Sequence, residues 1–201
     1  SSLASLCSLS SWREEGLLDN TIIALTADHG DMLGDHGRWA KTLMFDMSAK
    51  VPLVIVPPKG DTRITPGKVE NRLVETMDIM PTLLELAGVP IPDTVEGTSL
   101  LTDESRDHIY GEHWEGDFAN RMVRDSRYKL IYYPVGNSFQ LFDMQEDRRE
   151  EHDLSESADH TTIRSRLTDL LIAHLYGVDL EWLQDGVLVG VPLKPLPQYQ
   201  D

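Results

Sequence analysis

The feature that most constrains this chain is a short apolar run followed directly by a polar, glycine-rich stretch. Residues 21–25 read Thr-Ile-Ile-Ala-Leu, and a short run rich in β-branched residues predicts a buried strand. In open α/β sheets, ligands bind beyond the carboxyl ends of strands. The next residues therefore predict a loop that holds a divalent cation together with an anion; the alternative is a solvated connection. Its chemistry-bearing residues are Asp28, His29, Asp31, Asp35, His36 and Lys41.

The charge balance limits the partners of the chain. It has 201 residues, with 18 Lys plus Arg against 34 Asp plus Glu, and a formal net charge of −16. Nucleic acids and anionic membranes select basic surfaces, so we expect neither as a partner. A small anionic substrate is still compatible with this charge, because one lysine and a bound metal outweigh the field of the net negative charge at the site. No apolar run reaches the roughly 18 residues of a membrane span.

The start of the chain contains its single cysteine, Cys7. One cysteine permits no intrachain disulfide and is compatible with a reducing, cytoplasmic location; a periplasmic location applies if a signal peptide precedes Ser1. Residues 1–16 predict a short amphipathic helix that ends at Gly16, with Cys7 as a small buried residue. There is no initiator methionine, so we expect that the chain begins inside a longer gene product.

Two further elements are predicted in the first half. Residues 53–56 read Leu-Val-Ile-Val between prolines, which indicates a second buried strand. The clearest helix lies in 76–88; it should begin near Asp78, because Pro81 fits only a first turn, and end at Gly88. Met80, Leu83, Leu84 and Ala87 share one face of this helix.

The second half of the chain has a different sequence pattern. Residues 108–114, 121–125, 127–133 and 138–143 are short strand candidates separated by turns, which favours an antiparallel meander. Helix 161–176 should cover one face of it, with an apolar stripe and with His174 as a packed or rim histidine rather than a ligand. The stripe consists of Ile163, Leu167, Leu170, Leu171 and either His174 or Leu175. Residues 145–159 are interpreted as a solvated connection, and the tail is proline-rich from Pro192. We predict two domains, 1–104 and 105–201.

Four segments in this order resemble the sulfatase family of the alkaline phosphatase superfamily. They are NTIIALTADHGDMLGDHG (20–37) with WAKT (39–42), VPLVIVPP (51–58), DIMPTLLELAGVP (78–90), and MVRDSRYKLIYY (122–133) with QLFDMQED (140–147). The resemblance covers about residues 13–155. It implies an α/β fold, namely part of an alkaline phosphatase-like mixed sheet flanked by helices, followed by a small antiparallel sheet packed on a C-terminal helix.

The resemblance also assigns roles in the opening loop. The family binds one divalent cation, usually calcium, through two N-terminal acidic residues and a later Asp-Asn or Asp-His pair, which matches Asp28 and His29 here. Its sulfate-contacting lysine matches Lys41. A carboxylate suits Ca²⁺ or Mg²⁺, whereas an imidazole is more at home on Mn²⁺ or Zn²⁺, so Ca²⁺ is expected with Mn²⁺ or Mg²⁺ left open. The alternative roles are a helix cap for Asp28, a hydrogen bond within the loop for His29, and a surface ion pair of Lys41 with Asp46.

Two other histidines are candidates for the same site. His36 either supports a metal ligand from behind or packs within the loop. His113 either lies at the rim of the substrate pocket or packs in the first strand of the meander.

The family's nucleophile is a formylglycine made from Cys or Ser in a Cys-x-Pro-x-Arg motif far upstream. Cys7 stands in Cys-Ser-Leu-Ser-Ser, with Leu9 and Ser11 in the Pro and Arg positions, so this chain contains no nucleophile. We therefore expect the C-terminal portion of a metal-dependent hydrolase of small sulfate esters, inactive by itself. The alternatives are a phosphonate monoester or phosphodiester hydrolase of the same superfamily, or a non-catalytic fragment that acts as an interaction module. An exposed sheet edge would favour a homo-oligomer.

Overall fold

The computed structural model describes residues 10–193, which form two compact units. The first unit contains the chain up to Asp28 and Val51–Arg106, and the second contains His29–Lys50 and the chain from Asp107. The predicted division between residues 104 and 105 stays a prediction. Cys7 and the last part of the proline-rich tail lie outside the described residues. None of the described helices is long and apolar enough to cross a membrane.

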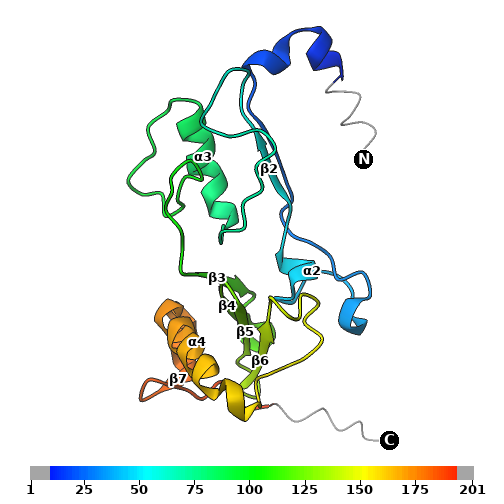
Figure 1. Cartoon of the computed structure of the whole chain (residues 1–201). Helices are drawn as coiled ribbons and strands as arrows, with labels where there is room; N and C mark the ends of the chain where they lie inside the picture. The colour runs from blue at the N-terminus through cyan, green and yellow to red at the C-terminus, as the bar shows by residue number, and fades with distance from the viewer. Residues whose placement is uncertain (1–9, 194–201) are drawn as a thin grey trace, which may run out of the picture. The chain divides into compact units, whose positions relative to one another are not determined.

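The elements follow one another in short segments (Figure 1). The strands are β1 (Ile23–Thr26), β2 (Leu53–Val56), β3 (His108–His113), β4 (Asn120–Asp125), β5 (Tyr128–Tyr133), β6 (Ser138–Asp143), β7 (Leu183–Gln184) and β8 (Val187–Leu188). The α-helices are α2 (Asp46–Ala49), α3 (Ile79–Leu86) and α4 (Thr161–His174), and residues 10–14 are also helical. Short 3₁₀-helices occupy Leu17–Asn20, Asp35–Gly37, Thr76–Asp78, Gly116–Phe118, Ala158–His160 and Gly177–Trp182.

The first unit is built on the two predicted strands. β1 and β2 pair antiparallel, from Ile23 opposite Val56 to Thr26 opposite Leu53. The expectation that both strands are buried is wrong for this chain, because Leu25 is 60% exposed and Val54 49% exposed. A two-stranded sheet has no interior of its own, and no further strand pairs with it among the described residues.

Helix α3 begins and ends where the sequence predicts, but a different face of it is buried. Met80 is 49% exposed, whereas Asp78 and Thr82 are fully buried. The Asp78 carboxylate accepts a bond from Thr98 N (2.8 Å) and a bidentate pair from Arg106, and the Thr82 hydroxyl accepts one from Leu100 N (2.9 Å). The polar groups that hold the following loop thus decide which side of α3 is covered.

Acidification is expected to destabilise the first unit through Asp78. Burial raises the pKa of this carboxyl, but hydrogen bonds from Arg106 and from the backbone of Glu75 and Thr98 outweigh burial and hold the pKa below its usual value. A carboxyl with a lowered folded-state pKa stabilises the fold above its unfolded pKa of about 3.9, and this stability is lost as pH falls through the folded value. NMR amide signals of α3, followed on acidification, should lose most of this pH dependence in Asp78→Asn and keep it in the exposed-site control Asp93→Asn. Equal acid sensitivity of Asp78→Asn and the parent chain would contradict this assignment.

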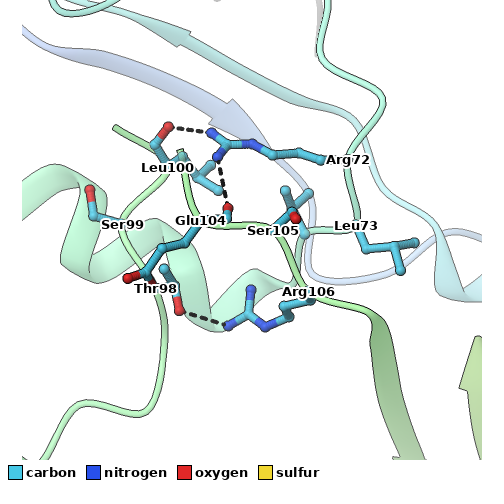
Figure 2. A pocket seen from close by; sticks show the side chains of 9 residues that line it. Arg72, Leu73, Thr98, Ser99, Leu100, Glu104, Ser105 and Arg106 are labelled. Carbon is cyan, nitrogen blue, oxygen red and sulfur yellow. Dashed lines mark hydrogen bonds between the residues drawn. The ribbon is translucent and has the colours of Figure 1, made fainter. Parts of the chain in front are cut away.

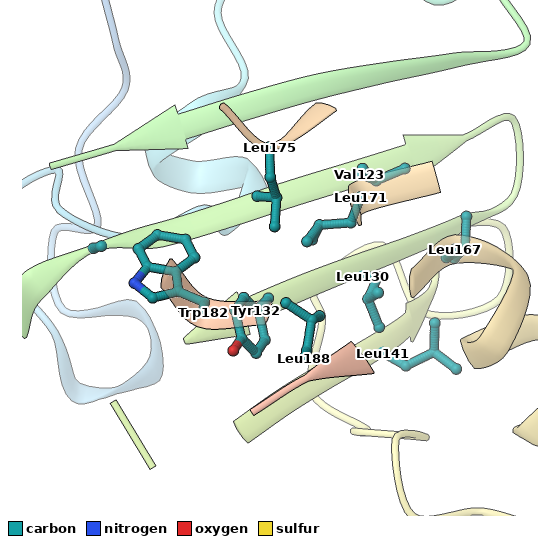
Figure 3. Close-up of a cluster of buried hydrophobic side chains, with 10 residues drawn as sticks. Val123, Leu130, Tyr132, Leu141, Leu167, Leu171, Leu175, Trp182 and Leu188 are labelled. Atoms are coloured by element: carbon teal, nitrogen blue, oxygen red, sulfur yellow. The ribbon is translucent and has the colours of Figure 1, made fainter. Parts of the chain in front are cut away.

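The second unit contains the predicted antiparallel meander, in the order β3-β4-β5-β6. Helix α4 packs on β4 and β5 (Figure 1). Figure 3 shows the core between them, into which α4 projects Leu167 and Leu171 at helical spacing. The 3₁₀-helix Gly177–Trp182 and the β7–β8 hairpin contribute Trp182 and Leu188 to the same core.

A second apolar cluster lies on the opposite face of the meander. Successive residues of a strand point to opposite faces, so Met122, Ile131 and Phe142 point away from α4, whose core contains Val123, Leu130 and Leu141. Met32, Met44 and Phe45 from the segment His29–Lys50 pack against them. The loop that the sequence singled out is thus held by the C-terminal sheet.

Candidate functional site

The segment His29–Lys50 is closed by backbone contacts at both ends. Gly30 N donates to Ser48 O (2.7 Å), and Met32 N donates to Ala40 O (2.9 Å). A Cβ at Gly30 would lie 2.0 Å from the Met47 carbonyl oxygen, so only glycine fits there. This close approach brings the start of the segment against α2.

His29 and Lys41 meet within this closed loop. His29 Nδ1 lies 2.7 Å from Gly30 O; a carbonyl only accepts, so Nδ1 carries the proton and Nε2 holds the lone pair. Lys41 Nζ contacts that Nε2. A histidine whose other nitrogen donates to a backbone carbonyl is in the form that ligates metals. Asp28 directly precedes His29 in the chain and belongs to the first unit.

The donor set fits a divalent cation in part. A carboxylate and an imidazole nitrogen are both ligand types for such ions. Nε2 of His29 holds the lone pair that would ligate, but Lys41 Nζ contacts it in this structure, so a cation at this atom would displace the lysine. Among the described residues, however, no group of three His, Cys, Asp or Glu side chains is placed to hold a metal. The assignment of Asp28 and His29 as ligands therefore stays a prediction.

The other two histidines occupy different surroundings. His36 stacks on Phe45, with ring centroids 4.2 Å apart, and its Nε2 lies 3.1 Å from Arg149 O. His113 ends β3 and stacks on Trp114, with centroids 5.6 Å apart. Burial, the charge of Arg121 and the charge of Lys41 lower the pKa of His113. Their roles in a site stay predictions.

A buried charge cluster escaped the sequence analysis. Lys129, 1% exposed, donates to Asp46, to Glu150 Oε1 (2.7 Å) and to Met44 O (3.1 Å). Glu150 is 3% exposed and also accepts from Asp46 N (2.6 Å). The interpretation of residues 145–159 as a merely solvated connection is therefore wrong, because Glu150 folds back to compensate a buried lysine. The sequence signal for this cluster was Lys129 itself, because it lies two residues before Ile131 and therefore on the same face of the strand.

The first unit contains a small pocket of a different kind. It encloses a cavity of about 90 Å³, lined by residues of 72–74, 98–100 and 104–106. Figure 2 shows Arg72 donating to the carbonyls of Leu100 and Glu104; it also donates to Thr102 O (2.7 Å). Arg72 thus holds the loop that covers α3, and none of the predicted site residues lines this pocket.

Comparison with known proteins identifies the family of this arrangement. The family model of N-sulphoglucosamine sulphohydrolase, C-terminal, matches residues 34–175. The chain belongs to the sulfatase family. The predicted family and α/β fold class are confirmed, and the solved structures that resemble the chain include sulfatases with the alkaline phosphatase-like fold.

Two sulfatase sequences show the extent of the match. The chain is 37% identical over 191 residues to an arylsulfatase of Clostridium perfringens, covering 91% of the chain and 40% of the relative. It is 33% identical over 157 residues to arylsulfatase K of Xenopus laevis, covering 69% of the chain and 28% of that protein. The chain thus spans less than half the length of these sulfatases.

Two solved structures extend the comparison. One is a complex of a protein with its substrate D-glucosamine-2-N,6-O-disulfate (TM-score 0.72, 28% identity, 81% of this chain and 35% of that one). The other is a phosphonate monoester hydrolase from Silicibacter pomeroyi (TM-score 0.71, 28% identity, 83% of this chain and 37% of that one). The sulfatase chain therefore shares its fold with a protein whose substrate is a sulfated glucosamine and with a phosphonate monoester hydrolase.

Proposed function

We propose that this chain is the C-terminal part of a metal-dependent sulfuric ester hydrolase that acts on small sulfate esters. The observation that carries the proposal is the contact of Lys41 with His29 in the loop that resembles the family's second metal-binding segment. The family match and the arylsulfatase relatives support the reaction class.

The roles follow from the chemistry of each side chain. Lys41 is a compact positive charge that binds a terminal sulfate oxygen and stabilises the charge that develops on it in the transition state. Asp28 and His29 supply two ligands of one divalent cation, with Ca²⁺ expected and Mg²⁺ or Mn²⁺ left open. The cation, when bound, polarises the ester oxygen. His36 holds the loop against Phe45 and so keeps this group of residues in place.

The nucleophile lies outside these 201 residues in this proposal. The sequence contains no Cys-x-Pro-x-Arg motif in which a formylglycine would form. The 201-residue chain alone is then inactive, and catalysis belongs to the product of the complete reading frame. An interaction module that forms homo-oligomers is the non-catalytic alternative.

The experiment is a comparison of Lys41→Ala with the parent protein, made in the product of the complete reading frame. We expect kcat for 4-nitrophenyl sulfate to fall by about 10²–10³, as for the loss of one donor to a developing oxyanion. Lys50→Ala removes a lysine of the same segment whose side chain is 69% exposed, and it should keep kcat. Unchanged turnover in Lys41→Ala would remove Lys41 from the site.

A second ester type is tested in the same assay. The phosphonate monoester hydrolase neighbour supports phosphonate monoesters as the alternative substrate. A phenyl phosphonate ester hydrolysed with a higher kcat/KM than 4-nitrophenyl sulfate would assign the chain to that reaction.

A further inference from the structure

An exposed group of aromatic rings lies at the end of β3. Trp114 is 58% and Phe118 70% exposed. Trp114 stacks on His113 at an interplanar angle of 13°, and Phe118 meets Trp114 edge-to-face, with centroids 5.5 Å apart and an angle of 88°. We call His113, Trp114 and Phe118 the aromatic platform. Large apolar side chains gathered in solvent are more informative than single exposed ones.

The backbone beneath the platform is held by a buried ion pair. Arg121 Nη1 donates to the carbonyls of His113 (3.2 Å) and Trp114 (2.9 Å). Asp179 fixes the same guanidinium through bonds of 2.6 and 2.8 Å. Trp114 has φ +56°, a left-handed conformation that bulky residues rarely adopt. The structure therefore maintains Trp114 in an unfavourable conformation, which is typical of functional positions.

One buried side chain ties the platform to Lys41. Asn120 is 2% exposed and stands opposite His113 in the β3–β4 pair. Its Nδ2 donates to the carbonyl of Thr42 (3.0 Å), the residue after Lys41, and to that of Phe118 (3.3 Å). Asn120 Oδ1 and His113 Nδ1 are buried and have no hydrogen-bond partner among the described residues. Such atoms mark places with a functional role or a bound water.

On the basis of the proposed function, we propose that the aromatic platform binds the ring of a cyclic leaving group, a pyranose or an aryl ring, of the ester whose sulfate contacts Lys41. Flat aromatic faces stack on the faces of other rings. The Trp114–Phe118 centroid distance is that of direct edge-to-face contact, so no ammonium group fits between these rings as it does in an aromatic cage. Trp114 and Phe118 are then specificity-determining residues.

The test is a titration of the 201-residue chain followed through the indole N–H signal of Trp114 by NMR. The probes are 4-nitrophenyl sulfate, glucosamine 6-sulfate and methyl sulfate. The two ring esters should shift the signal and bind about tenfold more tightly than methyl sulfate, as one stacking contact provides. The relative affinities of the aryl and the pyranose ester identify which ring the platform prefers.

The variants separate the platform from Lys41. The affinities of all variants are measured by isothermal titration calorimetry, because Trp114→Asn lacks the indole signal. Trp114→Asn, chosen because asparagine tolerates positive φ, should reduce the ring preference to about twofold or less. Phe118→Ala should reduce it independently, and Val187→Ala, which removes exposed surface from β8, should not. Lys41→Ala should weaken all three esters alike.

Each contrary outcome has a distinct meaning. A ring preference that survives both Trp114→Asn and Phe118→Ala would overturn the platform, as would tighter binding of choline O-sulfate than of the ring esters. If phenyl β-glucoside shifts Trp114 and Lys41→Ala changes no affinity, the platform stands and the proposed sulfate function fails. If Lys41→Ala alone weakens binding, the proposed function stands and the platform fails.

Discussion

Replacement of Asp179 by alanine is expected to destabilise the second unit by about 3–5 kcal/mol, the cost of leaving one partner of a buried ion pair uncompensated. Arg121 is 3% and Asp179 2% exposed, and the pair is bidentate. Burial opposes the charge on Arg121, but the hydrogen bond and charge of Asp179 outweigh it and raise the pKa of the guanidinium. Arginine does not deprotonate in proteins, so the charge stays buried after the substitution. Urea unfolding followed by tryptophan fluorescence measures the loss.

Two matched variants interpret that measurement. Asp179→Asn keeps the shape and one acceptor, so it should lose less stability than Asp179→Ala. Glu181→Ala removes an exposed carboxylate from the same turn and should change the free energy of unfolding by less than about 0.5 kcal/mol. If Asp179→Ala unfolds at the same urea concentration as the parent chain, the ion pair does not hold this unit together.

Replacement of Lys129 by methionine is also expected to lower the free energy of unfolding of the second unit by about 3–5 kcal/mol. The segment His29–Lys50 should detach from the sheet before the rest of the unit unfolds. The variant leaves Asp46 and Glu150 facing each other in a buried site without their common cation. Hydrogen exchange of the amides of α2 and of Gly30 should therefore accelerate more than that of β4 or β5. Lys50→Met is the matched control. Lys50 also pairs with Asp46, but at 3.9 Å and from an exposed position, so its loss should change the exchange rates little.

The pH dependence of the Lys129 variant should have the opposite sign to that of the parent cluster. In the parent, burial raises the pKa of Asp46, but Lys129, with Arg124 and Lys50, outweighs burial and holds the pKa below its usual value. The cluster therefore stabilises the parent at neutral pH and loses this effect on acidification. In Lys129→Met, burial and the like charge of Glu150 raise the folded-state pKa of Asp46. The variant should therefore regain stability as pH falls. A variant that weakens on acidification in parallel with the parent would contradict this account.

The elements that depend on local signals were predicted well. Prolines bound β2 at residues 53–56, and Pro81 with Gly88 limits α3, because each restricts the backbone at its own position. Alternation and closely spaced turns predicted the meander and its covering helix. The family followed from ordered segments, and the family model covers the larger part of the chain.

The candidate site was predictable only in its chemistry. The composition of the opening loop indicated a cation and anion site, and the resemblance to the sulfatases singled out Asp28, His29 and Lys41 within it. The structure brings His29 and Lys41 into contact. Trp114 and Phe118 carried no signal, since an aromatic residue in a turn is as compatible with packing as with binding. Their link to Lys41 runs through Asn120, which is 78 positions away from Thr42 in the chain.

The sequence by itself determined the bounds of β2 and α3, the antiparallel meander with its covering helix, the sulfatase family, and the ligand types in the loop, because these depend on neighbouring residues. Only the tertiary structure decided what covers each face: β1 stays exposed, and the loop segment packs on the meander. Lys129 selects Asp46, 83 positions away, and Glu150. The sequence alone does not show which acidic residues pair with this lysine. The fold brings two of them to it, and a buried lysine needs such partners to compensate its charge.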